Sequence, residues 1–141
     1  MVTFHEKSAW VMGVLLILVG GWYFNTVWEM SREMGETAPP ALGLVAVATA
    51  MLIAGSVASH ILLAIVDPAN SEGEEDERDQ QVLRRSGNIS GYVLGFGCFA
   101  GLWSFVWQAD GNLLFHIIVG SLLASQIAEY ALTIFFYRRG V

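Results

Sequence analysis

Four long apolar stretches constrain this chain more than any other feature of its sequence. They cover residues 9–28, 42–66, 89–107 and 113–136. Each one reaches the length of about 20 residues that a helix needs to cross a bilayer. Hydrocarbon holds no water to bond the backbone N–H and C=O groups, so these stretches must be helices. The sequence therefore predicts an all-α, four-transmembrane-helix bundle in which residues 1–141 form a single integral membrane domain.

The distribution of charge excludes a soluble enzyme domain. Charged residues make up 14% of the chain, against roughly 25% in an average soluble domain. Most of them lie in two short stretches, 29–36 and 67–85. The first apolar stretch has about 20 residues, which is longer than the 7 to 15 residues of a typical signal-peptide core. No small-x-small cleavage site follows it. We therefore expect it to be a true span.

Basic residues predict the orientation of the spans, because loops rich in Lys and Arg stay in the cytoplasm. With both termini inside, the inner segments hold six of the seven basic residues and the outer loops hold only Arg32. The six are Lys7, Arg78, Arg84, Arg85, Arg138 and Arg139. We therefore expect a multi-pass protein whose N-terminus and C-terminus are both cytoplasmic.

The cytoplasmic loop 67–88 is strongly acidic. Asp67-Pro68 ends the second span, and Ser71 with Glu74 forms a candidate capping box. Acidic residues come first in the following segment and arginines come last, as the helix dipole favours. We expect a short acidic cytoplasmic helix, which is either broken at Gly87 or continuous with the third span. Its carboxylates form a solvated face or a docking site for a basic partner.

A weak internal repeat relates the second and fourth spans. Residues 59–65 align with 128–134 at an offset of 69, which pairs His60 with Glu129. Two tandem helical hairpins related by an axis along the membrane normal would produce this match, and so would chance similarity between apolar helices. Both residues lie about 10 Å inside the membrane from the cytoplasmic end of their spans. They can meet if these two spans are neighbours.

Glu129 is the one acidic residue well inside a span. A charged side chain at the centre of a membrane helix costs roughly 2.5 to 3.5 kcal/mol, so Glu129 must be protonated, paired or exposed to a wet cavity. Gln126 lies three residues earlier on the same helix face. Two interpretations stay open. The polar set His60, Glu129 and Gln126 is either a contact that holds helices together or a proton- or ligand-binding site.

We expect no catalytic site, cofactor or metal. His60 and His116 would suggest a haem, but their predicted depths differ by about 15 Å in a hydrocarbon core about 30 Å thick. No His or Cys cluster has the spacing of metal ligands, and Cys98 is the single cysteine. The aqueous segments contain neither a glycine-rich phosphate loop nor a nucleophile motif, so we expect neither an enzyme nor a nucleic-acid partner.

Small residues recur every four positions in three of the spans. Such faces let helix backbones approach closely, which holds helices together where lipid provides no hydrophobic driving force. Four helices do not need all of this close contact internally, so we expect a surplus face for a second copy or another subunit. The alternative is that these residues pack only the monomer. The residues are Ala46, Ala50, Ala54 and Ala58, then Gly91, Gly95, Gly97 and Gly101, then Gly120 and Ala124.

One part of the sequence resembles a known protein group. The resemblance rests on the run Asp76-Glu77-Arg78-Asp79 with Arg84 and Arg85, on residues 91–94, and on Glu129 with the terminal Tyr137-Arg138-Arg139-Gly140. These features resemble a group of small prokaryotic four-helix membrane proteins described as a domain of unknown function. The likeness includes residues 59–65 and covers most of the chain from the second span onward. It implies the same topology in a prokaryotic inner membrane and implies no activity.

The sequence as a whole predicts a non-enzymatic accessory or interaction subunit of the membrane. It would assemble through its small-residue helix faces, as a homo-oligomer or within a larger membrane complex. The alternative is a proton-linked small transporter or channel, in which Glu129 takes up and releases a proton and His60 tunes or relays it. Small four-helix drug exporters fit poorly, because they carry an acidic residue inside the first helix and the first span here has none.

Overall fold

The computed structural model describes residues 4–66 and 77–139, and these form four long helices. They are α1 (Phe4–Met34), α2 (Leu42–Val66), α4 (Glu77–Gln108) and α5 (Gly111–Arg139). All four are long and apolar enough to cross a membrane. No strand occurs within the described ranges. The predicted all-α four-helix bundle is thus confirmed, and the chain is a multi-pass membrane protein.

Three helices extend beyond the apolar stretches that predicted them. Helix α2 has the predicted bounds 42–66, whereas α4 has 32 residues and is therefore about 48 Å long. This exceeds a hydrocarbon core of about 30 Å, so part of α4 projects from the membrane. Helix α4 begins at Glu77 and passes through Gly87 without interruption. The acidic helix and the third span are therefore continuous. The candidate capping box at Ser71 and Glu74 lies outside the described residues.

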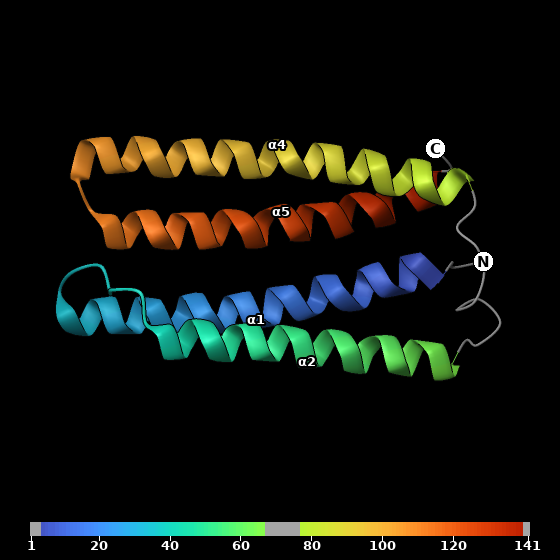
Figure 1. The fold of residues 1–141 in the computed structure, drawn as a ribbon, viewed down its shortest axis with the longest axis horizontal. Coiled ribbons are helices and arrows are strands. Elements are labelled where there is room, and N and C mark those ends of the chain that lie inside the picture. The colour runs from blue at the N-terminus through green and yellow to red at the C-terminus, as the bar shows by residue number, and fades with distance from the viewer. Residues whose placement is uncertain (1–3, 67–76, 140–141) are drawn as a thin grey trace.

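The helices lie side by side in the order α4, α5, α1, α2 (Figure 1). Helix α5 packs on α4 and α1, and α1 packs on α5 and α2. Helix α2 packs extensively on α1 alone. The start of α1 and the end of α5 lie at the same end of the bundle, which we call the terminal end; the loops 35–41 and 109–110 lie at the other, the loop end.

Left-handed residues terminate two of the helices at the loop end. Gly35 has a φ of 72°, and its N–H donates to the carbonyl of Ser31 at 3.0 Å. Ala109 has a φ of 51°, and its N–H donates to the carbonyl of Phe105 at 2.8 Å. A left-handed residue just after the last turn satisfies carbonyls that would otherwise lack donors. Both helices therefore stop at defined residues and turn sharply.

Small residues bring α4 and α5 close together. A side chain on Gly97 would overlap Ser121, and one on Gly101 would press on Ile117 at 3.1 Å. Between α1 and α2, a Cβ on Gly55 would lie 2.7 Å from Leu15, so the leucine fills the space that the glycine leaves. Close packing of this kind supplies the van der Waals contact that stabilises helices in lipid.

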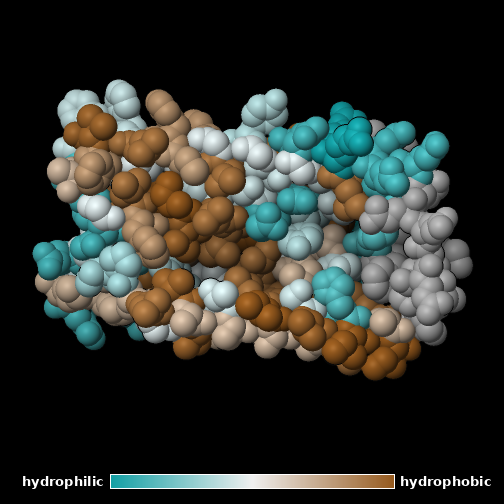
Figure 2. All heavy atoms as spheres, viewed as in Figure 1, coloured by the Kyte–Doolittle hydropathy of each residue, from teal (hydrophilic) through white to brown (hydrophobic). Residues whose placement is uncertain are grey.

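The surface of the bundle is mostly apolar. Figure 2 shows brown, hydrophobic side chains over much of one face and along α2, and teal side chains gathered over the start of α4. Helix α2 contains no buried residue. A helix that is apolar all round belongs in a core or a membrane. In this chain α2 meets one helix and leaves its other faces open.

Candidate functional site

Glu129 lies in the seam between α5 and α4. Its side chain is half-buried, and its Oε2 lies 3.4 Å from the hydroxyl of Ser90. Its Oε1 would lie 3.9 Å from a Cβ on Gly87, so the carboxyl group occupies the space beside this glycine. The hydroxyl of Ser125 donates to the carbonyl of Ser90 at 2.9 Å. Glu129 therefore has polar neighbours on α4 and does not face acyl chains alone.

The Ser90 hydroxyl has two possible acceptors and one proton. It lies 2.9 Å from the carbonyl of Gly87 and 3.4 Å from Glu129. A hydroxyl donates one hydrogen bond and can accept others. Both contacts are satisfied together when Ser90 donates to Gly87 and a protonated Glu129 donates to Ser90. When Glu129 is ionised, the single proton of the Ser90 hydroxyl is donated either to the Gly87 carbonyl or to Glu129.

The structure does not bring His60 and Glu129 together. His60 is exposed on α2, where its Nε2 lies 3.4 Å from the hydroxyl of Ser8 and its Nδ1 lies 2.7 Å from the carbonyl of Ser56. Helix α1 separates α2 from α5 in the row (Figure 1). Gln126 is exposed on α5, while Glu129 three residues later is half-buried. The three residues of the predicted polar set therefore have three different surroundings.

A second polar cluster lies at the loop end and is more deeply buried. His116 is 6% exposed and Tyr23 is 2% exposed. The Nδ1 atom of His116 lies 3.1 Å from the hydroxyl of Tyr23, and its Nε2 lies 2.9 Å from the carbonyl of Ala38. A carbonyl only accepts, so Nε2 carries the proton and donates. In the neutral ring Nδ1 then accepts from the Tyr23 hydroxyl.

The same cluster holds the loop between α1 and α2 in place. The Ser31 hydroxyl accepts a bond from the N–H of Ala38 at 2.9 Å. The side-chain amide of Asn112 donates to the carbonyl of Thr37 at 3.2 Å. Three separate contacts, including that of His116, therefore connect residues 37–38 to α1 and α5.

Asp110 caps α5 beside this cluster. Its Oδ1 accepts from the N–H groups of Leu113 at 3.0 Å and Asn112 at 2.9 Å. The pKa of Asp110 is lowered by hydrogen bonds, first from the Leu113 N–H and then from the Thr37 side chain and the Asn112 N–H. These donors favour the ionised carboxylate. Its negative charge also suits the positive N-terminal end of the helix dipole.

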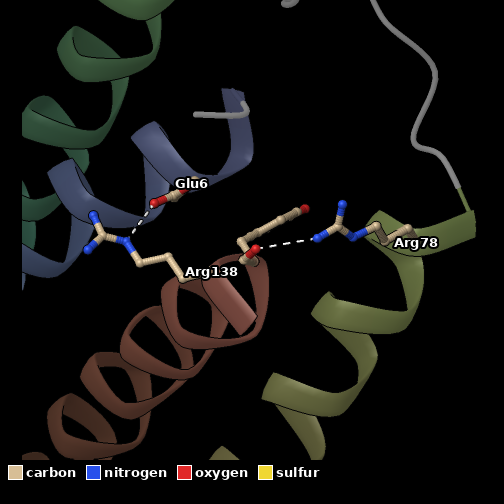
Figure 3. A network of polar contacts seen from close by, with 4 residues as sticks. Glu6, Arg78 and Arg138 are labelled. Atoms are coloured by element: carbon tan, nitrogen blue, oxygen red, sulfur yellow. Dashed lines mark hydrogen bonds and ion pairs between the residues drawn. The ribbon is translucent and has the colours of Figure 1, made fainter. Parts of the chain in front are cut away.

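The terminal end carries a network of charged residues (Figure 3). The Nε of Arg138 donates to Glu6 Oε1 at 3.1 Å, which connects α5 to α1. Arg78 donates to the carbonyl of Tyr137 at 3.3 Å, and the Tyr137 hydroxyl donates to Asp79 at 2.6 Å. The end of α5 is therefore bonded to both of its neighbours.

No group of three or more His, Cys, Asp or Glu side chains in the described ranges could hold a metal ion.

The predicted helix-packing residues divide into two sets. One set packs within the monomer and consists of Gly97, Gly101 and Gly120; a Cβ on Gly120 would lie 3.2 Å from Phe24 of α1. Gly91 and Gly95 are exposed on α4, and a Cβ on either would meet nothing within 4 Å. Exposed small residues also include Ala124 on α5 and the four alanines of α2, Ala46, Ala50, Ala54 and Ala58.

Sequence reasoning missed the serines that line the seam between α4 and α5. Ser86 and Ser90 on α4 and Ser121 and Ser125 on α5 are all buried. Their spacing of four was a usable signal, because it places each pair on one helix face. The sequence suggests His116 only as a haem ligand, because its partners Tyr23 and Ala38 cannot be inferred without the helix order.

Comparison with known protein families, curated proteins and solved structures finds no match.

Proposed function

We propose that this protein is a non-enzymatic assembly subunit of a prokaryotic inner membrane, in which copies associate through the outward faces of α2 and α4. The observation that carries this proposal is the exposure of α2. This helix contains no Asp, Glu, Lys or Arg, has no buried residue and packs extensively on one neighbour. Lipid covers such a helix in a monomer, and a second helix covers it in an assembly.

The two outer helices of the row have complementary features for this association. Helix α2 exposes a line of small residues, of which Ala50 and Ala54 are central, and α4 exposes Gly91 and Gly95. Small side chains at spacing four let two backbones approach closely. Because α2 and α4 lie at opposite ends of the row, α2 of one copy would meet α4 of the next. Such a head-to-tail contact builds a closed ring or a larger array.

Measuring the oligomeric state of the full chain in lipid nanodiscs tests this proposal. Native mass spectrometry is expected to give oligomers for the wild type and monomers for Gly95→Leu. Helix α1 offers a matched control in Gly21→Leu, because Gly21 is also exposed with nothing within 4 Å of its Cβ position. The control is expected to assemble like the wild type. A monomeric wild type, or equal assembly by all three proteins, would contradict the proposal.

A proton-linked transporter or channel is the second candidate, and the contact between Glu129 and Ser90 favours it. A carboxyl group that can donate to Ser90 when protonated and accept from it when ionised has a partner in both states. His60 contacts α1 rather than α5, so this candidate depends on Glu129 and Ser90. Both proposals include cytoplasmic N- and C-termini, because basic residues gather at the terminal end and Lys and Arg favour the cytoplasmic side.

Proton flux into proteoliposomes tests this second candidate. Glu129→Gln keeps the shape of the side chain and removes its ionisation, so it is expected to abolish flux while leaving the oligomeric state unchanged. Gln126→Ala alters an exposed neighbour on the same helix and is expected to retain flux. If wild-type protein carries no flux above empty liposomes, the transporter candidate fails and the assembly proposal is unaffected.

A further inference from the structure

An apolar groove runs between α1 and α5 near the terminal end of the bundle. It has a volume of about 220 Å³. Gly13 and Ile17 of α1 line one side, and Tyr130 and Ile134 of α5 line the other, with Trp10 at one end. From Trp10 to Ile17 the groove follows α1 for about 10 Å. This space is far too narrow for a helix, whose diameter with side chains is about 10 to 12 Å.

Gly13 contributes no side chain to the groove that it lines. A Cβ at this position would come within 3.7 Å of the Cβ of Tyr130, on the opposite wall. The walls are built from larger residues, and both Trp10 and Ile17 are about half exposed. The groove is therefore open to the lipid phase along its length, and its lining offers an acyl chain apolar contact rather than hydrogen bonds.

A guanidinium group lies over the end of the groove. The Cζ atom of Arg138 is 5.7 Å from the ring centroid of Trp10. Only its Nε is bonded within the described part of the chain, to Glu6, and the Arg138 side chain is 64% exposed. Figure 3 shows its two Nη atoms pointing away from Glu6. These two groups are available to a phosphate, which arginine binds through paired N–H donors.

The next residue adds a second positive charge at the same level. The Cζ of Arg139 lies 4.5 Å from the ring centroid of Phe135, and this arginine has no carboxylate partner among the described residues. Glu6 balances Arg138, so Arg139 leaves a net positive charge at this end of α5. Each basic residue near a membrane surface favours anionic lipid over zwitterionic lipid by a factor of about five.

From this geometry we propose that the groove binds one acyl chain of an anionic phospholipid in the leaflet next to the chain termini. The Nη groups of Arg138 hold the phosphate, and Trp10 packs where the glycerol region meets the acyl chain. An apolar channel and a guanidinium lying at its end match the two parts of such a lipid. This inference does not depend on the proposed assembly, because the groove involves neither α2 nor α4.

The test is a lipid titration of the detergent-purified full chain, followed by native mass spectrometry. Phosphatidylglycerol is expected to bind about fivefold more tightly than phosphatidylcholine with the same acyl chains. Gly13→Leu fills the groove and is expected to weaken the binding of both lipids at least tenfold. Ala131 of α5 also lines the groove, so Ala131→Leu is expected to weaken the binding of both lipids in the same way. This second variant keeps the test valid if Gly13→Leu fails to fold. Arg138→Gln removes the phosphate contact that both lipids share, so it is expected to weaken the binding of both, and that of phosphatidylglycerol more, so that the preference for phosphatidylglycerol is lost.

Matched controls separate this site from general attraction between lipids and the protein. Gly21→Leu changes an exposed glycine elsewhere on α1, and Arg84→Gln removes an exposed arginine from α4; both are expected to bind like the wild type. Inorganic phosphate alone is expected not to displace the lipid. Unchanged binding in folded Gly13→Leu or Ala131→Leu would overturn the proposal. Equal losses in Arg138→Gln and Arg84→Gln, or displacement by phosphate, would overturn it as well.

Discussion

The hydroxyl of Tyr23 lies 3.1 Å from Nδ1 of His116, although 93 residues separate the two in the sequence. Tyr23 belongs to α1 and His116 to α5, so this bond joins the first pair of helices to the second. The other ring nitrogen of His116 donates to the carbonyl of Ala38. One buried imidazole therefore fixes a helix pair and a loop at the same time.

Tyr23→Phe is expected to destabilise the protein by about 1 to 3 kcal/mol, because it leaves the Nδ1 of His116 buried without a donor. Unfolding of the detergent-solubilised chain, followed by circular dichroism, measures the change. Tyr92→Phe provides the control, since Tyr92 is 79% exposed on α4. Identical unfolding curves for Tyr23→Phe and the wild type would show that this bond contributes nothing.

Gly97→Ala is expected to lower the free energy of unfolding by about 1 to 3 kcal/mol, the usual cost of overpacking. The added methyl group would overlap the side chain of Ser121. Gly91→Ala adds the same group where nothing lies within 4 Å, so it is expected to change stability by less than about 1 kcal/mol, in the stabilising direction. Adding Ser121→Gly should restore stability to Gly97→Ala. Equal effects of the two alanine substitutions would disprove the close contact.

Asp110 gives stability a defined dependence on pH. Its pKa in the folded protein is lowered from 3.8, mainly by the Leu113 N–H. A carboxyl group with a lowered folded-state pKa stabilises the fold above its unfolded-state pKa, and this contribution is lost as pH falls through the folded-state value. The wild type should therefore be more stable than Asp110→Ala at pH 7. The difference should shrink only below about pH 4; a difference that vanished near pH 6 would implicate another group.

Ala109→Gly is expected to stabilise the protein by about 1 kcal/mol. Ala109 has a φ of 51°, a left-handed conformation that costs an alanine roughly 1 to 2 kcal/mol and a glycine far less. Part of this gain is offset by the greater freedom of glycine in the unfolded chain. Thermal unfolding in detergent measures the effect. Destabilisation by Ala109→Gly would mean that its methyl group makes contacts worth more than the relief of strain.

The sequence by itself determined the helices, because an apolar segment in hydrocarbon must bond its own backbone N–H and C=O groups, and a helix does this within one segment. It predicted α2 with its observed bounds 42–66. It also singled out Glu129, since a lone carboxyl group inside a span must find polar surroundings. It could not say whether α4 would break at Gly87, because a glycine weakens a helix without ending it.

Tertiary structure alone decided which residues meet. Apolar residues are spread around each of these helices instead of gathered on one face, so hydropathy says little about which helix packs against which. The order α4, α5, α1, α2 depends on local shape, such as the space at Gly55 that Leu15 fills. That order places Glu129 against Ser90 instead of His60, and it gives His116 its partner Tyr23. The residue types were readable from the chain, and their pairing was set by close packing between helices distant in sequence.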